Sequence, residues 1–485
     1  MQRRDTARLT AAAALVLSFA PTLMRRPRRA QLAVSTASIG LGGLAGSATE
    51  LLVVRLAQEL DGGEAAARRL LAGLGVLSVA AELPESPRAG VALAGQAARV
   101  AGICALIGSV APARETVPLD DPRRIAALFG VGVAALAAWQ QLERRSRPRR
   151  PRLETFPPEH ALRTVSALGG GFEGSRFTGT AAEGLARDPV RVFVGVDAAE
   201  TVEERARLAV DELERLGAWS RRRLLVCSPT LRGYVNPIPV AAEEALAGGD
   251  VASVAIQYFD RRTLFMPLKV GIAARTHRAL LEELRRRVPA GVEICVYGES
   301  LGAWASQNVF RRGGVRALDE VRVARALWIG TPYFSPLPRL LASGAIPTDA
   351  RVASVAVAEL VAGDVEHDAR FVFVARRTDP VVLFRGLDLI WRRPEWLPPG
   401  AWTPGITFLQ LAFDLIAATN WPSTMPQALA HDYRLEGPLA VDLAFGHHAP
   451  RARLSELADR LVADEVARGA RIRALRRADG YTPGH

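Results

Sequence analysis

The feature that most constrains the fold of this chain is a long run without a charged side chain, residues 30–49. A helix needs roughly 20 apolar residues to cross the hydrocarbon core of a bilayer, and this run has that length. Similar apolar runs, one of them interrupted by Arg99, occupy residues 9–24, 70–81, 89–113 and 125–142. We therefore predict that residues 1–143 form an all-α transmembrane region of four or five helices.

Arginine clusters set the expected orientation of these helices. Lys and Arg number 62 against 50 Asp and Glu, which gives a net charge of +12. The densest cluster, RRSRPRRPR at 144–152, follows the last apolar run. Because basic loops concentrate on the cytoplasmic side, we expect a multi-pass protein of the cell membrane whose remaining chain is cytoplasmic. The cluster at 25–29 also falls inside if the helices number five, which favours that count.

The same clusters bear on the partners of the protein. A basic chain can bind nucleic acid, but these arginines are scattered and gather beside apolar segments, where anionic lipid headgroups are the simpler partner. We therefore expect the membrane as a partner and no nucleic acid, and the sequence leaves the oligomeric state open. Cys104, Cys227 and Cys295 lie far apart in the chain, so they offer neither a disulfide framework nor a zinc spacing.

Past a basic linker rich in Pro and Gly, residues 144–184, short β-branched runs alternate with helical periodicity. Strands are predicted at 190–196, 224–228, 251–258, 292–297, 326–332 and 370–375, and helices at 201–217, 238–247 and 270–288. Strands that alternate with crossover helices predict a mostly parallel sheet with helices on both faces. We therefore expect an α/β domain over residues 185–485, with its chemistry at the carboxyl ends of the strands.

One such strand end carries the motif Gly298-Glu299-Ser300-Leu301-Gly302, between the strand VEICVY and a helical stretch. Glycines two residues before and two after a serine allow a sharp turn from strand to helix, which exposes the hydroxyl at the edge of the sheet. The alternative is an ordinary serine in a structural turn. The position of the motif favours Ser300 as a nucleophile.

A serine hydroxyl needs a base, and the base needs a carboxylate that fixes its tautomer. Asp379 directly follows the strand at 370–375 and precedes Pro380, which favours it as the acid, although it could also cap a turn. His431 follows a loop after the acid and is favoured as the base. The pair His447-His448 leaves His447 as a rival base.

The remaining parts of an acyl-transfer site are also predicted from position. An oxyanion needs backbone donors, and we expect the N–H of Leu301 and a second donor at Thr230, in the loop after the strand at 224–228. Tyr258, Phe259 and Trp304 are expected to line a substrate pocket. Trp391, Trp396, Trp402 and Trp421 mark a Trp- and Pro-rich region near 385–425, expected either to cap that pocket and touch headgroups or to pack as a subdomain.

Several stretches resemble the actinobacterial membrane-anchored α/β-hydrolase family: GYVNP, GGDVASVAIQYF, VYGESLGAWASQ, ALWIGTPYF and TDPVV. The resemblance covers essentially the whole chain and is strongest from about 185 to 385. It implies an α/β-hydrolase fold, preceded by a helical membrane region, and a serine hydrolase activity. By position it assigns Ser300 as nucleophile, Asp379 as acid and His431 as the late histidine of a His-x-Tyr motif.

We therefore expect a membrane-embedded serine hydrolase that cleaves an acyl ester, with a lipid or other acyl ester as substrate and no metal or nucleotide cofactor. An acyltransferase would use the same triad. A different class is an inactive membrane scaffold or a transport-associated protein. The family tends to carry Thr-Gly-Thr-Gly where this chain has Thr230-Leu231-Arg232-Gly233, and Pro-Gln-Ala-Leu-Ala precedes His431.

Overall fold

The computed structural model divides the chain into two compact units. It describes residues 3–4, 6–19, 28–59, 63–80, 104, 113–114, 164–180, 184–230, 233–259, 266–311, 313–342, 349–365, 369–394, 397, 402–403, 405–418 and 430–478. The helical unit comprises Met1–Pro148 and Phe384–Asn420, and the sheet unit comprises Arg149–Leu383 and Trp421–Pro483. The two units are described separately below.

The sheet unit is built on eight strands in the order β3-β4-β6-β5-β7-β8-β10-β9. Every neighbouring pair is parallel, so all carboxyl ends lie at one edge. The strands are β3 (Val165–Leu168), β4 (Val190–Val194), β5 (Arg223–Ser228), β6 (Val251–Ile256), β7 (Glu293–Glu299), β8 (Val323–Ile329), β9 (Val352–Ala356) and β10 (Phe371–Ala375).

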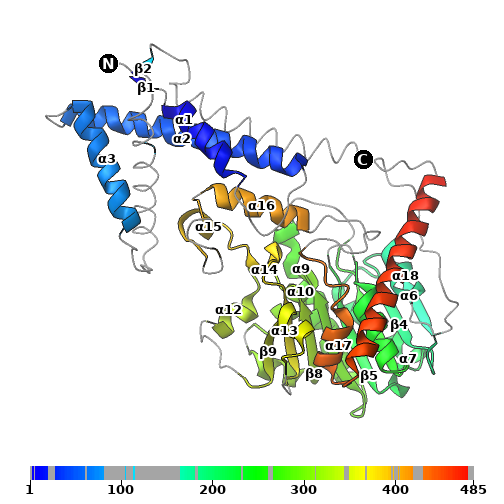
Figure 1. Cartoon of the computed structure of the whole chain (residues 1–485). Helices are drawn as coiled ribbons and strands as arrows, with labels where there is room; N and C mark the ends of the chain where they lie inside the picture. The colour runs from blue at the N-terminus through cyan, green and yellow to red at the C-terminus, as the bar shows by residue number, and fades with distance from the viewer. Residues whose placement is uncertain are drawn as a thin grey trace. The chain divides into compact units, whose positions relative to one another are not determined.

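Helices cover both faces of this sheet (Figure 1). One face carries α7 (Val202–Arg215), α9 (Met266–Arg287), α10 (Leu301–Asn308) and α11 (Val315–Glu320), and the other carries α8 (Pro237–Leu246), α13 (Val357–Ala362), α17 (Gly437–Phe445) and α18 (Arg451–Ala478). Shorter helices are α6 (Gly171–Gly179), α12 (Pro336–Ala342), α14 (Pro380–Leu383) and the 3-10 helix η1 (Ala218–Ser220).

The alternation of side chains along each strand divides the core in two. In β7, Ile294 and Val296 belong to the cluster that includes α7 and α9, whereas Cys295 and Tyr297 belong to the cluster that includes α8 and α17. Successive side chains of a strand point to opposite faces. A strand buried on both faces therefore reads as a continuous apolar run, which is the pattern that predicted it.

Local signals fix where two of these helices begin. Thr201 Oγ1 accepts from the N–H of Glu204, whose carboxylate accepts from the N–H of Thr201, so α7 starts in a capping box. Asn236 accepts from the N–H of Ile238 and caps α8, and Pro237 takes the first helical position.

The predicted mostly parallel sheet with helices on both faces is confirmed, and all six predicted strands are present within a few residues. The sequence pattern missed β3 and β9. Both are edge strands, and β3 has only four residues. Edge strands are buried less completely, so their apolar pattern is weaker.

The helical unit holds α1 (Thr6–Leu17), α2 (Arg28–Glu59), α3 (Gly63–Ala80), α15 (Asp388–Trp391) and α16 (Ile406–Ala418), with the two-residue strands β1 (Arg3–Arg4) and β2 (Ala113–Arg114). Among the described residues, one helix is long and apolar enough to cross a membrane, Val34–Gln58 within α2. The described residues therefore do not support the expected all-α bundle of four or five transmembrane helices.

The other expected spans differ for physical reasons. At 12 residues α1 is too short. The charged residues of α3 lie in its first turns, where buried Arg68 forms ion pairs with Glu50 of α2 and with Glu64. The uncharged run that follows them is too short to cross a bilayer. Of the expected runs, 125–142 and nearly all of 89–113 lie outside the described residues.

The segment between the predicted acid and base also groups differently from the expected domain division. We expected a cap region near 385–425 within the sheet domain, but Phe384–Asn420 belongs to the helical unit. There, Gln410 of α16 donates to the main-chain carbonyl of Ser18 at 3.0 Å.

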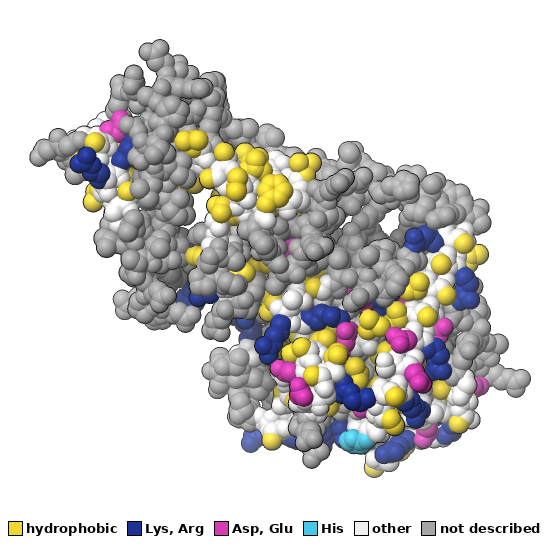
Figure 2. All heavy atoms as spheres, viewed as in Figure 1, with side chains coloured by type: hydrophobic (Ala, Val, Ile, Leu, Met, Phe, Trp, Pro, Cys, Tyr) yellow, Lys and Arg dark blue, Asp and Glu magenta, His cyan; other side chains and the backbone are white. Residues whose placement is uncertain are grey.

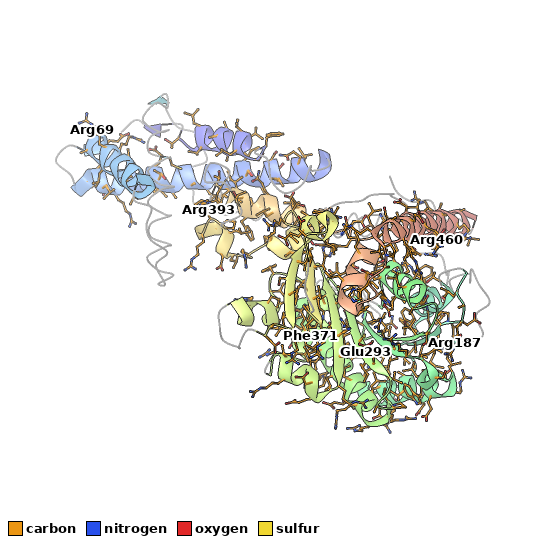
Figure 3. All side chains as sticks on the ribbon, turned by 60° about the horizontal axis from the view of Figure 1, so that its bottom comes forward. Arg69, Arg187, Glu293, Phe371, Arg393 and Arg460 are labelled. Carbon is orange, nitrogen blue, oxygen red and sulfur yellow. The ribbon has the colours of Figure 1, made fainter. Side chains whose placement is uncertain are left out.

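A buried ion pair in the sheet unit generates a stability prediction. Arg191 of β4 donates to both carboxylate oxygens of Glu244 in α8, at 2.6 and 2.7 Å, and neither residue is exposed to solvent. Arg191→Met leaves that carboxylate buried and unpaired, so we expect a loss of about 3–5 kcal/mol. The matched control is Arg187→Met, whose pair with Asp250 is exposed (Figure 3) and should contribute less than about 1 kcal/mol.

The measurement is the denaturant midpoint of the full chain in detergent. Equal shifts for the two variants would contradict the assignment of Arg191 as a buried partner.

Candidate active site

Ser300 lies on the turn between β7 and α10, with backbone angles φ 55° and ψ −125°. Positive φ is strained for a residue with a side chain. The Ser300 N–H donates to the carbonyl of Ile329 at 3.0 Å, which ties this turn to the end of β8. A Cβ on Gly302 would lie 2.1 Å from the carbonyl oxygen of Ser228, so glycine is required where α10 packs on the end of β5.

Asp379 and His431 meet at the same edge of the sheet. Asp379 follows β10 and is fully buried. Its Oδ2 accepts from the Tyr433 hydroxyl at 2.6 Å and lies 2.6 Å from Nδ1 of His431. Its Oδ1 accepts from the N–H of Val381. These contacts hold the carboxylate in the position that orients an imidazole.

The end of β8 brings His431 toward the Ser300 turn. A Cβ on Gly330 would lie 2.8 Å from Cε1 of His431, and Gly330 has φ +55°. The neighbouring carbonyl, that of Ile329, accepts the Ser300 N–H. Nε2 of His431 is buried, and no described residue forms a hydrogen bond with it. The ring therefore has one nitrogen committed to the acid and the other available.

The rival base, His447, lies at the opposite edge. Its Nε2 is 2.7 Å from Glu243 Oε2 and 3.2 Å from Nη1 of Arg223, the first residue of β5. Arg223 also pairs with Glu293, the first residue of β7, and Figure 3 labels Glu293 at this amino end. Six strand residues span about 17–20 Å, so His447 is too far from Ser300 to act on it.

The expected oxyanion donors fare differently. Leu301 is the first residue of α10, so its N–H has no partner within the helix. The N–H of Thr230 instead donates to the carbonyl of Tyr234 at 2.7 Å. That N–H is therefore hydrogen-bonded within a turn, and the expected role of Thr230 as an oxyanion donor stays a prediction. Leu231 and Arg232 lie outside the described residues.

Trp304 lies one turn after Ser300 on α10. Side chains of a helix lean toward its N-terminus, so the indole leans toward the nucleophile. Its ring centroid is 6.4 Å from that of Phe334, which also contacts Tyr333 edge to face. The sequence pattern did not single out Tyr333 and Phe334, although they directly follow GTP after β8. Phe334 is 39% exposed, so this aromatic cluster is open to solvent.

The other two expected pocket residues follow β6, on the same edge but on a more distant strand. β5 separates β6 from β7, which places Tyr258 and Phe259 about two strand spacings, roughly 10 Å, from the Ser300 strand. Their role in a pocket stays a prediction.

Glu299 is a further residue that the sequence pattern left without a role. Its Oε2 accepts from Asn236 Nδ2 and from the Tyr297 hydroxyl, each at 2.9 Å. Burial raises the pKa of this carboxyl, and the two donors and the charge of His431 oppose that change. Glu299 thus joins the start of α8 to the turn that carries the nucleophile.

Metal chemistry has no evident ligand set in the part of the chain that the structure describes. No group of three or more His, Cys, Asp and Glu residues is arranged there to hold an ion.

The model of a family described as "Alpha/beta-hydrolase family" matches residues 190–441. The matched segment begins at β4, ends in α17 and includes Ser300, Asp379 and His431. It covers more than half of the chain. No curated protein and no solved structure matches the chain.

The surroundings of His431 generate a pH prediction. Burial lowers the pKa of His431, but the Asp379 carboxylate and its hydrogen bond outweigh burial, with Glu299 and Asp432 adding to them, so the pKa lies above the ordinary 6.5. The neutral ring is the base, so reactivity should increase as the pH rises through that raised pKa. We expect the rate at which a fluorophosphonate labels Ser300 to have its inflection above pH 6.5.

Glu299→Gln is the matched variant. It removes a negative charge near the His431 ring, so it should move the inflection of the labelling rate to lower pH. An inflection at or below pH 6.5 in the unchanged protein would contradict the prediction.

Proposed function

The chain belongs to the alpha/beta-hydrolase family, and on that premise we propose that it is a serine hydrolase that cleaves an acyl ester through an acyl-enzyme on Ser300. The observation that carries this proposal is the carboxylate–imidazole pair of Asp379 and His431 at the edge of the sheet where the strained Ser300 turn lies. A buried ring with one nitrogen bonded to a carboxylate and the other without a partner among the described residues suits a general base.

In this mechanism Ser300 Oγ attacks the acyl carbonyl while Nε2 of His431 takes its proton. Asp379 keeps the proton of the imidazole on Nδ1 and stabilises the imidazolium that forms. The N–H of Leu301 donates to the oxyanion. The imidazolium then protonates the departing alcohol, and water, deprotonated by the same ring, hydrolyses the acyl-enzyme and releases the acid.

A lipid-like acyl ester is the substrate class that the surroundings favour. The aromatic cluster of Trp304, Tyr333 and Phe334 begins one helical turn from the nucleophile. Aromatic side chains of this kind bind apolar chains well. The apolar helix Val34–Gln58 supports a location at a membrane, where such esters are abundant. An alcohol in place of water at the last step would make the enzyme an acyltransferase.

One observation favours a second candidate, a catalytically inactive membrane scaffold or transport-associated protein. The N–H of Thr230 donates to the carbonyl of Tyr234 and would have to leave that bond to reach an oxyanion. A site with one backbone donor stabilises the tetrahedral intermediate less well, since each donor contributes about 10²–10³ in rate. Labelling of Ser300 by a fluorophosphonate separates the serine hydrolase from the inactive scaffold.

We expect a fluorophosphonate to label the detergent-solubilised protein and to lose this reaction in Ser300→Ala. His431→Ala should slow labelling by about 10²–10⁴-fold, because it removes the general base. His447→Ala, the matched control, should label within a few-fold of the unchanged rate, since His447 lies at the amino edge.

The measurement is the labelling rate per folded protein, with a known serine hydrolase as a positive reference. Absence of labelling in the unchanged protein, while the reference reacts, would favour the inactive scaffold. Loss in His447→Ala alone would overturn the assignment of the base.

A further inference from the structure

The polarity of α16 is inverted with respect to a helix on a soluble protein. Its polar side chains, Thr407, Gln410 and Asp414, are at most 1% exposed. Among the side chains of α16 that the structure describes, the partly exposed ones are apolar: Phe408, Leu409, Ala412 and Leu415. A helix at a water-exposed surface shows the opposite arrangement, whereas helices in lipid turn polar side chains toward the protein.

The neighbouring helices share this inversion. Ser18, Ser35 and Ser38 are buried, whereas Val16 is 71% and Leu32 is 69% exposed. The space-filling view shows apolar side chains gathered over α1 and α2 (Figure 2). An exposed apolar surface of this extent marks an interaction site, and the buried serines argue for an apolar solvent on its outer side.

A polar node fixes α16 to these helices. Ser18 directly follows α1 and is buried, so its main-chain carbonyl needs a partner from the protein. Gln410 donates to the carbonyl of Ser18 at 3.0 Å, and Gln31 of α2 donates to the same oxygen at 3.0 Å. The hydroxyls of Ser18 and Ser35 are 2.8 Å apart. Since an unpaired backbone group in lipid costs several kcal/mol, this node holds the three helices in one arrangement.

The flanks of α16 suit a membrane surface. Tryptophans occur on both sides of it in the chain, at 391, 396 and 402 before it and at 421 after it. Trp is enriched where a bilayer meets water. Arg392 and Arg393 precede α16 in the chain and are exposed, and Figure 3 labels Arg393. The charge of these side chains complements anionic headgroups.

Length and chain direction limit how α16 could enter a bilayer. Its 13 residues extend about 20 Å at 1.5 Å per residue, which is less than the hydrocarbon core of about 30 Å. The chain leaves the sheet unit after Leu383 and returns to it at Trp421. Both ends of the excursion therefore lie on the same side of any membrane.

We propose that α16 is a membrane element that packs against α1 and α2, enters one leaflet of an anionic lipid bilayer, and leads the chain back to the side from which it came. The occupant of its apolar face is the acyl region of the lipids. This proposal goes beyond the hydrolase reaction and does not depend on it. It gives the polypeptide between Asp379 and His431 a lipid contact of its own.

The test places a fluorophore on that face in the full chain. Ala412→Cys is labelled with an NBD maleimide and reconstituted into vesicles of phosphatidylcholine and phosphatidylglycerol. The native Cys104, Cys227 and Cys295 are buried, and the unsubstituted protein reports their background. The matched control is Ala463→Cys, an exposed alanine of the helix α18.

We expect NBD at residue 412 to lose about half or more of its fluorescence to lipids that carry a doxyl group on the acyl chain, and to resist aqueous iodide. A doxyl group near the headgroup should quench more than one near the chain end. The label at 463 should respond to iodide alone.

Iodide quenching at 412 equal to that at 463 overturns the proposal. Protection from both quenchers also overturns it, because protein would then cover the face. If Ala412→Cys does not fold, Leu409→Cys on the same face gives the same test. Because the readout is fluorescence, a loss of Ser300 labelling with quenching preserved would count against the hydrolase and not against the membrane element.

Discussion

The parallel register of the sheet is the constraint on which the rest of the sheet unit depends. β7 pairs with β5 and β8 so that Gly298 lies between Ser228 and Trp328. The chain therefore makes its sharp turn at Ser300 where the neighbouring strands also end. β10 delivers Asp379 to the same edge, since it runs parallel to β8. One pairing pattern thus places residues that are far apart in the sequence within reach of one another.

The two edges of the sheet differ in how they treat buried polar groups. At the amino edge, Arg223 pairs with Glu243 and Glu293. His447 contacts the carboxylate of Glu243, so the charged groups there have partners. At the carboxyl edge, Ser300 is strained and Nε2 of His431 has no partner among the described residues. Unsatisfied and strained groups reduce stability and persist where chemistry needs them. The satisfied ion pairs at the amino edge stabilise the fold, and that stability allows the carboxyl edge to hold the strained Ser300 turn.

Periodicity and the positions of strand ends predicted the strands of the sheet and the motif around Ser300. Runs such as 190–196 identify strands because both faces are buried. The motif around Ser300 favours a nucleophile because it follows such a run. The sequence favoured His431 over His447 without excluding the rival, because no local pattern reveals to which edge of a sheet the chain returns. The turn in which the Thr230 N–H donates to Tyr234 could not be predicted either, because it depends on local backbone geometry.

The helical unit was harder to predict. The apolar character of α16 is evident from the sequence, but composition does not identify the partner of a helix, so the segment near 385–425 was expected as a cap of the sheet domain. Likewise, the apolar runs before residue 143 suggested several spans. The ion pairs of Arg68 with Glu50 and Glu64 lie just outside the runs 30–49 and 70–81 and join α2 to α3 through buried charge, which hydropathy does not register.

Because Phe384–Asn420 packs with α1 and α2, the sheet unit is discontinuous in the chain. α17 and α18, which complete one of its two cores, follow that excursion and must close a long loop to reach the sheet. Loop closure costs entropy that grows with the free length, by about 0.6 kcal/mol for each doubling. Docking of α16 shortens the free length. During synthesis α1 and α2 emerge first, so they are present to receive α16 before the residues that finish the sheet unit are made.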